Sequence, residues 1–322
     1  MQTLLSVRNL SIGVHEKGQL LSSVEDISFD IYQGEILGLV GESGSGKSLT
    51  ALSIPGLLGE NKELSGGGIF YQGKNLPALA EKELESIRGK EISMIFQEPF
   101  SSLNPLVKIG AQIAETLALH EEKDKAQIKD RVRELMEKVG LPDPLKLMNS
   151  YPHHLSGGMC QRVMIALAVI CRPRLLIADE PTTALDFNTQ AQILSLMKET
   201  NRDLGTSILF ISHDLEVIKS LCSRVLVMYS GRILEEGKTE EIFSHPAHEY
   251  TRGLLGCIPN RANRGRDLAA IPGKVPSLEE GRPNGCPFHP RCAKAGPRCE
   301  GEFPPALSVS ATHTSRCVLE ER

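Results

Sequence analysis

A glycine-rich stretch near the start of the chain has the spacing of a phosphate-binding loop. Residues 41–48 read Gly-Glu-Ser-Gly-Ser-Gly-Lys-Ser, which fits the pattern GxxxxGK[ST]. The glycines let successive backbone N–H groups turn towards phosphate oxygens, and the positive end of the following helix adds to the attraction. In this chemistry Lys47 contacts the β- and γ-phosphates and Ser48 is a ligand of Mg²⁺. A chance glycine-rich turn is disfavoured because an apolar strand precedes the loop and helix-compatible residues follow it.

We therefore expect the loop and the first helical turn to hold a nucleotide through a contiguous set of residues: Ser43, Gly44, Ser45, Gly46, Lys47, Ser48 and Leu49. An acidic pair, Asp179-Glu180, follows a second apolar run and complements this set. Asp179 can join the Mg²⁺ shell, and Glu180 can polarise an attacking water. Acidic residues are common at strand ends, so the pair alone is weak evidence for a nucleotide site. It becomes informative because a phosphate loop lies about 130 residues earlier.

The elements that must position these residues are apolar runs alternating with helix-compatible segments. Alternating patterns predict half-buried strands at residues 4–10 and 24–31, and Gly66-Gly67-Gly68 with the following apolar residues and Gly73 suggests a hairpin. Residues 106–140 favour helices. Continuous apolar runs predict buried parallel strands at 36–40, 175–178, 207–211 and 224–228. This alternation predicts an α/β layered domain, with polar chemistry at the carboxyl ends of its strands.

Further motifs occur in the order found in the ATPases of ATP-binding cassette (ABC) transporters. Residues 155–161, Leu-Ser-Gly-Gly-Met-Cys-Gln, resemble the signature segment of that family. Gln97 matches its Q-loop glutamine, residues 183–186 match its D-loop, and His213 matches its switch histidine. The resemblance covers about residues 4–255. It implies an ABC-type P-loop NTPase domain with an antiparallel β subdomain and a helical subdomain at about residues 98–160.

The resemblance also implies roles for these residues in binding and hydrolysing ATP with Mg²⁺. Glu180, His213 and Gln97 would be catalytic, and Gln97 would also lie beside the Mg²⁺ held by Ser48 and Asp179. In the family ATP is sandwiched between two ATPase subunits, so that hydrolysis needs closure of the dimer. The nucleotide would then also be contacted by residues of the signature segment and D-loop: Ser156, Gly157, Gly158, Gln161 and Asp186.

The signature segment has its own physical logic, because Ser156 and the two glycines precede a predicted helix at 159–171. A hydroxyl and bare N–H groups at a helix start suit an anion. Two positions depart from the family pattern. Cys160 stands where many relatives carry a basic residue, and we expect little loss from it. Val14 stands where the family places an aromatic residue that stacks on adenine, and His15 is the nearest alternative.

The cysteines and prolines are unevenly distributed, which predicts a boundary near residue 256. Four of the eight cysteines fall within 32 residues near the C-terminal end, and nine of the 19 prolines lie in residues 256–322. We expect an ATPase domain at 1–255 and a loop-rich extension at 256–322. In a reducing compartment the cysteines are not expected to form a disulfide framework. Their spacing, C-x5-C-x6-C-x17-C, suits a soft metal or an iron–sulfur cluster rather than a paired zinc ribbon: Cys286, Cys292, Cys299 and Cys317.

This extension resembles that of bacterial oligopeptide, dipeptide and nickel importer ATPases of the D type. The resemblance rests on residues 248–255, 282–286 and 290–292, with further similarity at 100–105 and 180–186. It implies a four-iron four-sulfur cluster on the four cysteines, with zinc left open by spacing alone. It also implies a heterodimer with a second ATPase subunit, two transmembrane permease subunits docked through the helical subdomain, and an extracytoplasmic substrate-binding protein.

Composition limits the other classes of protein. The chain has 322 residues, 40% of them apolar, and a formal net charge of −4. Such a balance argues against a general nucleic-acid coat, so no nucleic-acid partner is expected. No apolar run approaches the roughly 20 residues that span a bilayer, and the first residues lack the pattern of a secretory signal. We expect a cytosolic chain, held at the cytoplasmic face of the inner membrane by its partners.

Two alternatives of other classes stay open at this stage. A soluble ABC ATPase of DNA repair or translation usually carries two cassettes or long insertions, whereas this chain has one phosphate loop and one signature segment. A regulatory module that binds ATP without turnover is disfavoured by Glu180 and His213. The cargo is not encoded in an ATPase subunit, so peptide, nickel chelate, glutathione or opine would suit these residues equally.

Overall fold

The structure is a computed structural model that describes residues 2–121, 124–183, 185–258 and 270–320. The chain forms two compact units. The signature unit contains Met1–Leu4, Ile31–Glu35 and Ala78–Phe210, and therefore the segment 155–161. The phosphate-loop unit contains Leu5–Asp30, Ile36–Pro77 and Ile211–Arg322.

Short buried strands form the centre of the signature unit. β6 (Ile92–Ile95) and β7 (Leu175–Asp179) pair in parallel, and β8 (Ser207–Ile211) is the next neighbour of β7. Every residue of the three strands is buried. Continuous apolar runs form such strands because both faces of a parallel sheet are covered. The buried strands predicted at 175–178 and 207–211 are therefore confirmed, and the first of them pairs in parallel with β6.

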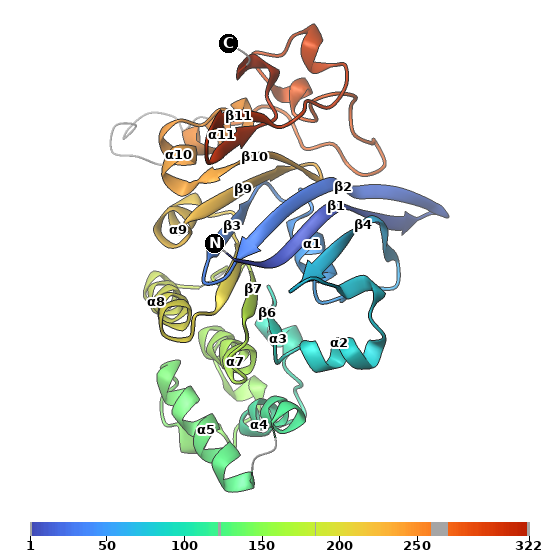
Figure 1. Ribbon diagram of the computed structural model, residues 1–322. Coiled ribbons are helices and arrows are strands. Elements are labelled where there is room, and N and C mark those ends of the chain that lie inside the picture. Colours follow the sequence, from blue (N-terminus) through green and yellow to red (C-terminus); the bar gives the residue numbers. More distant parts are fainter. Residues whose placement is uncertain (1, 122–123, 184, 259–269, 321–322) are drawn as a thin grey trace. The chain divides into compact units, whose positions relative to one another are not determined.

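Helices make up the rest of the signature unit (Figure 1). α4 (Ile109–His120) and α5 (Lys125–Lys138) contact each other, and both contact α7 (Gly157–Val169), which confirms the helices predicted within 106–140. The Asp124 carboxylate accepts a hydrogen bond from Gln127 N at 2.8 Å and so caps α5. The other helices of this unit are α2 (Glu81–Ile87), α3 (Pro99–Ser102), α6 (Pro144–Leu147), η2 (Pro152–His154) and α8 (Phe187–Leu204).

An antiparallel sheet built from the N-terminal strands contributes to the phosphate-loop unit. Its strand order is β2-β1-β4-β5. The bounds are β1 (Thr3–Glu16), β2 (Gln19–Tyr32), β4 (Lys62–Tyr71) and β5 (Lys74–Asn75). The expected hairpin is present, and it turns at Gln72-Gly73, where both residues have positive φ. The three consecutive glycines lie inside β4.

A second set of strands in the same unit carries the phosphate loop. β3 (Ile36–Val40) is fully buried and pairs in parallel with β9 (Arg224–Tyr229), as predicted for both apolar runs. The sheet continues through β10 (Arg232–Lys238), β12 (His313–Ser315) and β11 (Leu307–Ser310) in antiparallel pairs. Helices of this unit are α1 (Lys47–Ser53), α9 (Leu215–Leu221), α10 (Thr239–Ser244) and α11 (Glu249–Gly256).

The C-terminal residues, orange to red in Figure 1, pack within the phosphate-loop unit. Regular structure after α11 consists of β11, β12 and short 3-10 turns: η4 (His289–Arg291), η5 (Pro297–Cys299) and η6 (Val318–Glu320). One further turn, η1 (Leu76–Ala78), follows β5. β12 joins β10 with Glu235 opposite Ser315. The sequence division into 1–255 and 256–322 stays a prediction.

Candidate functional site

The phosphate loop of the sequence folds around its own lysine. Lys47 is buried, and its Nζ donates to Gly41 O at 2.8 Å and Glu42 O at 2.9 Å, with Ser45 Oγ at 3.3 Å. The tip of the loop, Ser43-Gly44, is exposed. An ammonium group at the centre of a loop with an accessible tip can contact an anion that the loop binds.

The start of α1 fixes the conformation of this loop. Gly46 has φ +99°, and a Cβ there would lie 2.9 Å from Met228 Cε and from Val24 Cγ2. Gly46 O accepts hydrogen bonds from Thr50 N at 2.9 Å and from Thr50 Oγ1 at 3.0 Å. The next residues, Ser48 and Leu49, lie half-buried on the first turn of α1. Glycine is thus required where the strand-to-helix turn closes.

His213 lies in the same unit, in the turn between β8 and α9. Its side chain is exposed. The following Asp214 caps α9 by accepting from Glu216 N at 2.9 Å and Val217 N at 3.2 Å, and its own N donates to Ser212 Oγ at 3.0 Å. These hydrogen bonds of its neighbours Ser212 and Asp214 fix the position of His213 just after β8.

In the signature unit the structure brings Gln97 and Glu180 together across 83 positions of sequence. Gln97 Nε2 donates to Glu180 Oε2 at 3.3 Å, and Thr183 Oγ1 donates to the same oxygen at 2.9 Å. The two residues meet because β6 and β7 are parallel neighbours, whose carboxyl ends lie at one edge of the sheet. Asp179, the last residue of β7, directly precedes Glu180 in the sequence and is buried.

Glu180 has φ +47°, which is an unfavourable region for a residue with a side chain. Such strain persists where the surrounding structure imposes it, and it clusters at functional sites. The hydrogen bonds from Gln97 and Thr183 aim the carboxylate while the backbone is held. This arrangement suits a group that must be oriented towards a water molecule.

The signature segment forms the N-terminus of α7, two residues earlier than expected. Ser156 caps the helix by accepting from Met159 N at 3.4 Å, and Gly157 and Gly158 form its first turn. Cys160 is buried and its Sγ faces Pro152 O at 3.6 Å, so this departure from the family pattern fills an interior position. Burial raises the pKa of its thiol.

Hydrogen bonds hold two other residues that the sequence predicts to contact nucleotide, Gln161 and Asp186. Gln161 is buried, and its Nε2 donates to Pro181 O at 2.6 Å, which ties α7 to the segment that follows Glu180. Asp186 caps α8 and accepts from Asn188 N and Thr189 N at 3.0 Å each and from Thr189 Oγ1 at 2.7 Å. These bonds, that of the Thr189 side chain first, lower the pKa of Asp186.

At the expected adenine-stacking position, Val14 lies in β1 opposite Lys62 of β4. The neighbouring His15 has its Nε2 3.2 Å from Glu63 Oε2. The part of the chain that the structure describes thus has an aliphatic side chain where the family pattern has a ring, as the sequence indicates. What contacts the base stays a prediction.

All four C-terminal cysteines line one cavity of about 10 Å³ in the phosphate-loop unit. Three of them, Cys286, Cys299 and Cys317, are buried, and Cys292 is partly exposed. Cys286 N donates to Cys299 O at 2.9 Å. Gly285 has φ +73°, and a Cβ there would lie 2.2 Å from the same carbonyl oxygen, so glycine is needed for this approach. Residues separated by up to 31 positions therefore converge on one space.

Sequence reasoning missed His248, which also lines this cavity. Its Nδ1 accepts a hydrogen bond from Tyr250 N at 3.0 Å, so the ring proton lies on Nε2, which faces Cys286 Sγ at 3.6 Å. Burial lowers the pKa of His248 to about 4, which keeps the ring neutral. The residue belongs to the stretch 248–255 that carried the resemblance, but nothing in the sequence placed it beside a cysteine.

The chemistry of this donor set fits a metal group. Burial, with a smaller contribution from the other three cysteines, raises the pKa of Cys286 to about 12, so a bound cation would have to displace protons. Four thiols are the usual ligands of both zinc and iron–sulfur clusters. Within the described ranges, no three His, Cys, Asp or Glu side chains are arranged to hold a single metal ion. The thiols converge without forming a closed single-ion site.

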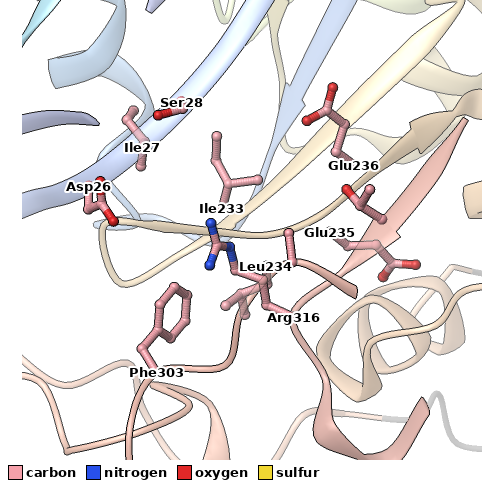
Figure 2. Close-up of a pocket in the computed structure, with 11 residues that line it drawn as sticks. Asp26, Ile27, Ser28, Ile233, Leu234, Glu235, Glu236, Phe303 and Arg316 are labelled. Atoms are coloured by element: carbon pink, nitrogen blue, oxygen red, sulfur yellow. The ribbon is translucent and has the colours of Figure 1, made fainter. Parts of the chain in front are cut away.

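Figure 2 shows a larger cavity of about 80 Å³, whose lining includes Arg316. Arg316 also lines the cysteine cavity. The Phe303 ring contacts two guanidinium groups, with its centroid 4.1 Å from Arg232 Cζ and 4.9 Å from Arg316 Cζ. Asp26 and Glu236 add carboxylates to the lining. The cation–π contact with Arg232 attaches the C-terminal segment to β10.

Among the residues that the structure describes, no helix is both long enough and apolar enough to cross a membrane.

Comparisons with known proteins agree with this arrangement. The family profile described as ABC transporter matches residues 24–183, and the profile of the oligopeptide/dipeptide transporter C-terminal region matches residues 234–299. The chain is 48% identical over 300 residues to the oligopeptide transport ATP-binding protein OppD of Haemophilus influenzae. The aligned residues make up 93% of this chain and 92% of the relative. It is 43% identical to the dipeptide transport ATP-binding protein DppD of Bacillus subtilis, over 100% of this chain and 96% of the relative.

Solved structures extend the likeness to the fold. The dimeric ATP-binding cassette MJ0796 bound to ADP and Pi matches with a TM-score of 0.67 and 26% identity, over 73% of this chain and 99% of that chain. The expected ABC-type fold is thereby confirmed for the cassette. With relatives this similar over nearly their full length, the chain belongs to the family of ATP-binding subunits of ABC-type oligopeptide and dipeptide transporters.

Proposed function

We propose that this chain is the ATP-hydrolysing motor subunit of a bacterial ABC importer for dipeptides or oligopeptides. The observation that carries the proposal is the pair formed by Gln97 and Glu180, in which a strained residue at a strand end is aimed by two hydrogen bonds. The loop folded around Lys47 supports the nucleotide part of the proposal. The names of the relatives supply the cargo class.

The proposed division of labour follows the chemistry of each group. The phosphate loop, from Ser43 to Leu49, binds the phosphates of ATP, with Lys47 at the β- and γ-phosphates. Ser48, Asp179 and Gln97 would hold Mg²⁺ through oxygen atoms, and the ion would neutralise phosphate charge. Glu180 accepts a proton from the attacking water, and His213 donates to the γ-phosphate.

Residues of the signature segment serve a second nucleotide. Ser156, Gly157 and Gly158 offer a hydroxyl and N–H groups to the γ-phosphate held by a second ATPase subunit. Gln161 supports this helix start through its bond to Pro181, and Asp186 shapes the D-loop side of the contact. A homologous but different subunit is the proposed partner, so that the motor is a heterodimer.

The membrane partners are proposed to be two permease subunits, supplied with cargo by an extracytoplasmic substrate-binding protein. Large apolar side chains that are exposed in and around the helical region support docking there: Phe100, Leu106, Leu119 and Leu145. Such docking would hold the chain at the cytoplasmic face of the inner membrane. The same ATPase role in a nickel, glutathione or opine importer is the alternative, because the cargo leaves no mark on these residues.

The cysteine cavity is proposed to hold a four-iron four-sulfur cluster through Cys286, Cys292, Cys299 and Cys317. Support comes from their convergence on one cavity and from the position of His248, whose Nε2–H faces Cys286 Sγ, because hydrogen bonds to sulfur tune such clusters. The proposed role is structural, since the segment has little core of its own. Zinc on the same thiols is the alternative.

Substitutions at two positions test the motor role. Lys47→Ala should weaken MgATP binding by the full chain, because the loop loses its central cation. Glu180→Gln keeps the shape of the carboxylate but removes the base, so ATP should still bind while turnover in the transporter complex falls about 100-fold or more. Steady-state phosphate release and ATP binding measure the two effects. Near-normal turnover by the Glu180→Gln complex would contradict the proposal and favour an ATP-binding module of another kind.

A further inference from the structure

The C-terminal segment that carries the cysteines reaches into the phosphate loop through Arg291, the residue before Cys292. Its guanidinium group forms a bidentate ion pair with Glu42, with Nη1 to Oε2 at 2.7 Å and Nη2 to Oε1 at 3.2 Å. Nη1 also donates to the hydroxyl oxygen of Tyr229 at 3.3 Å. Glu42 is the second residue of the phosphate loop. A side chain 249 positions away thus binds the loop directly.

Every polar group of Glu42 has a partner within this unit. Its N–H donates to the Tyr250 hydroxyl at 2.9 Å, and its C=O accepts from Lys47 Nζ at 2.9 Å. Its carboxylate is held by Arg291. The residue therefore links the lysine of the loop to α11 and to the C-terminal segment.

A cluster of rings supports these contacts from the side of the cysteines. Phe288 lies with its ring centroid 5.5 Å from that of Tyr229 and 5.2 Å from that of Tyr250, and His248 lies at 6.1 Å from the same ring. His248 in turn faces Cys286. A packed series of side chains thus runs from the cysteine cavity to the phosphate loop.

The ion pair between Arg291 and Glu42 is partly buried, and it neutralises a negative charge in the phosphate loop. The Arg291 side chain is 7% exposed, and the Glu42 side chain is 25% exposed. Burial alone would lower the pKa of Arg291, but its bonds to Glu42 and Tyr229 raise it above the ordinary value. A carboxylate in a loop that binds phosphate would repel the ligand if it were unpaired. Arg291 neutralises that charge and fixes its direction at the same time.

We propose that Arg291 is a positioning residue for nucleotide binding, which pairs with Glu42 so that the phosphate loop keeps its shape and presents no unpaired negative charge to ATP. Through this pair the cysteine segment supports the ATP site of its own chain. The inference rests on the proposed function, since it assumes that the loop binds ATP. Arg291 and Glu42 take no part in the hydrolysis step itself; their proposed role is to hold the loop that binds ATP.

Substitutions in the full chain, purified with its metal content measured, test this role by MgATP affinity. Arg291→Gln should weaken binding about tenfold, because Glu42 is left unpaired beside the phosphate site. The double variant Arg291→Gln/Glu42→Gln should regain most of the lost MgATP affinity, because it no longer carries the carboxylate that repels the phosphates. Arg291→Lys should lie between, since it keeps a charge but cannot form the bidentate pair.

A matched control lies in the same segment. Lys294 is two residues beyond Cys292, and its Nζ pairs with Glu249 Oε1 at 2.9 Å on the exposed surface. Lys294→Gln removes one charge from the segment without touching Glu42, so MgATP affinity should stay as in the parent. Amide hydrogen exchange over residues 41–46 supplies a second readout, and it should become faster in Arg291→Gln alone.

Several outcomes would overturn the inference. Parent-like affinity of Arg291→Gln would exclude the role, and so would an equal loss in Lys294→Gln. A double variant that binds ATP more weakly than Arg291→Gln would show that the two residues act separately. Lys47→Ala in the same assay separates the two proposals. If Lys47→Ala leaves affinity unchanged, the ATP site itself is misassigned, whereas loss in Lys47→Ala without loss in Arg291→Gln removes only the role of Arg291.

Discussion

At the scale of single residues, backbone conformation decides where the chemistry lies. Gly46 adopts φ +99° at the turn into α1, where neighbouring side chains leave no room for a Cβ. Glu180 adopts φ +47° although it carries a side chain, and Gln97 and Thr183 hold its carboxylate. One site is therefore open to glycine alone, and the other tolerates strain because hydrogen bonds and the preceding strand fix it.

Replacing Gly46 by alanine should accordingly impair the phosphate loop. The new methyl group would meet Met228 and Val24 at 2.9 Å in a conformation that alanine disfavours, so the turn must shift. We expect MgATP affinity to fall by about tenfold or more, measured by titration of the full chain. Gly59→Ala is the matched control, because a Cβ there would make only ordinary contacts at 3.8 Å. Equal affinities of the two variants would count against the turn geometry described above.

At the scale of elements, helix ends place the remaining candidates. Ser156 caps α7 and Asp186 caps α8, so each sits where helix N–H groups lack partners inside the helix. Gln161 then anchors α7 to the segment after β7. The same local rules that end these helices put a hydroxyl and two glycines at the start of α7, where an incoming phosphate could bind.

A substitution at the start of α7 tests whether this end faces a second ATP. A Cβ at Gly158 would lie 3.3 Å from Thr189 Cγ2, so a side chain there is tight but tolerable. Gly158→Asp should leave ATP binding by the isolated chain intact and abolish hydrolysis and transport by the complex, because the carboxylate would repel the γ-phosphate. Gly158→Ala, which adds bulk without charge, should retain most of the activity. Normal transport by Gly158→Asp would refute the sandwiched arrangement for this site.

At the scale of the whole molecule, the C-terminal segment packs within the phosphate-loop unit. β12 extends the sheet next to β10, and two arginines of the segment contact residues near the N-terminus of the chain. Arg282 contacts Glu25 and the carbonyl oxygen of Ser22, and Arg291 contacts Glu42. The Phe303 ring of the segment also contacts Arg232 of β10. A group that ties down the cysteines would therefore stabilise contacts with the ATP-binding part of the chain.

The metal content of the chain tests the cysteine site at this scale. Protein purified without oxygen should be brown and carry about four iron atoms per chain, and single Cys→Ser changes at Cys286 or Cys317 should lower both the iron content and the melting temperature. Cys257→Ser is a control, since that cysteine does not line the cavity. A colourless protein with one zinc would overturn the iron assignment and keep the four ligands. Unchanged metal content in the Cys→Ser variants would refute the shared site.

The sequence alone determined the phosphate loop, the acidic pair, the buried strands and the family, because these depend on local spacing and on the period of apolar residues. Tertiary structure decided which distant residues meet. Pairing of β6 with β7 brought Gln97 to Glu180, and the fold of the C-terminal segment brought Arg291 to Glu42 and His248 to Cys286. No local pattern encodes such contacts, because their partners are chosen by strand pairing and packing between segments up to 249 positions apart.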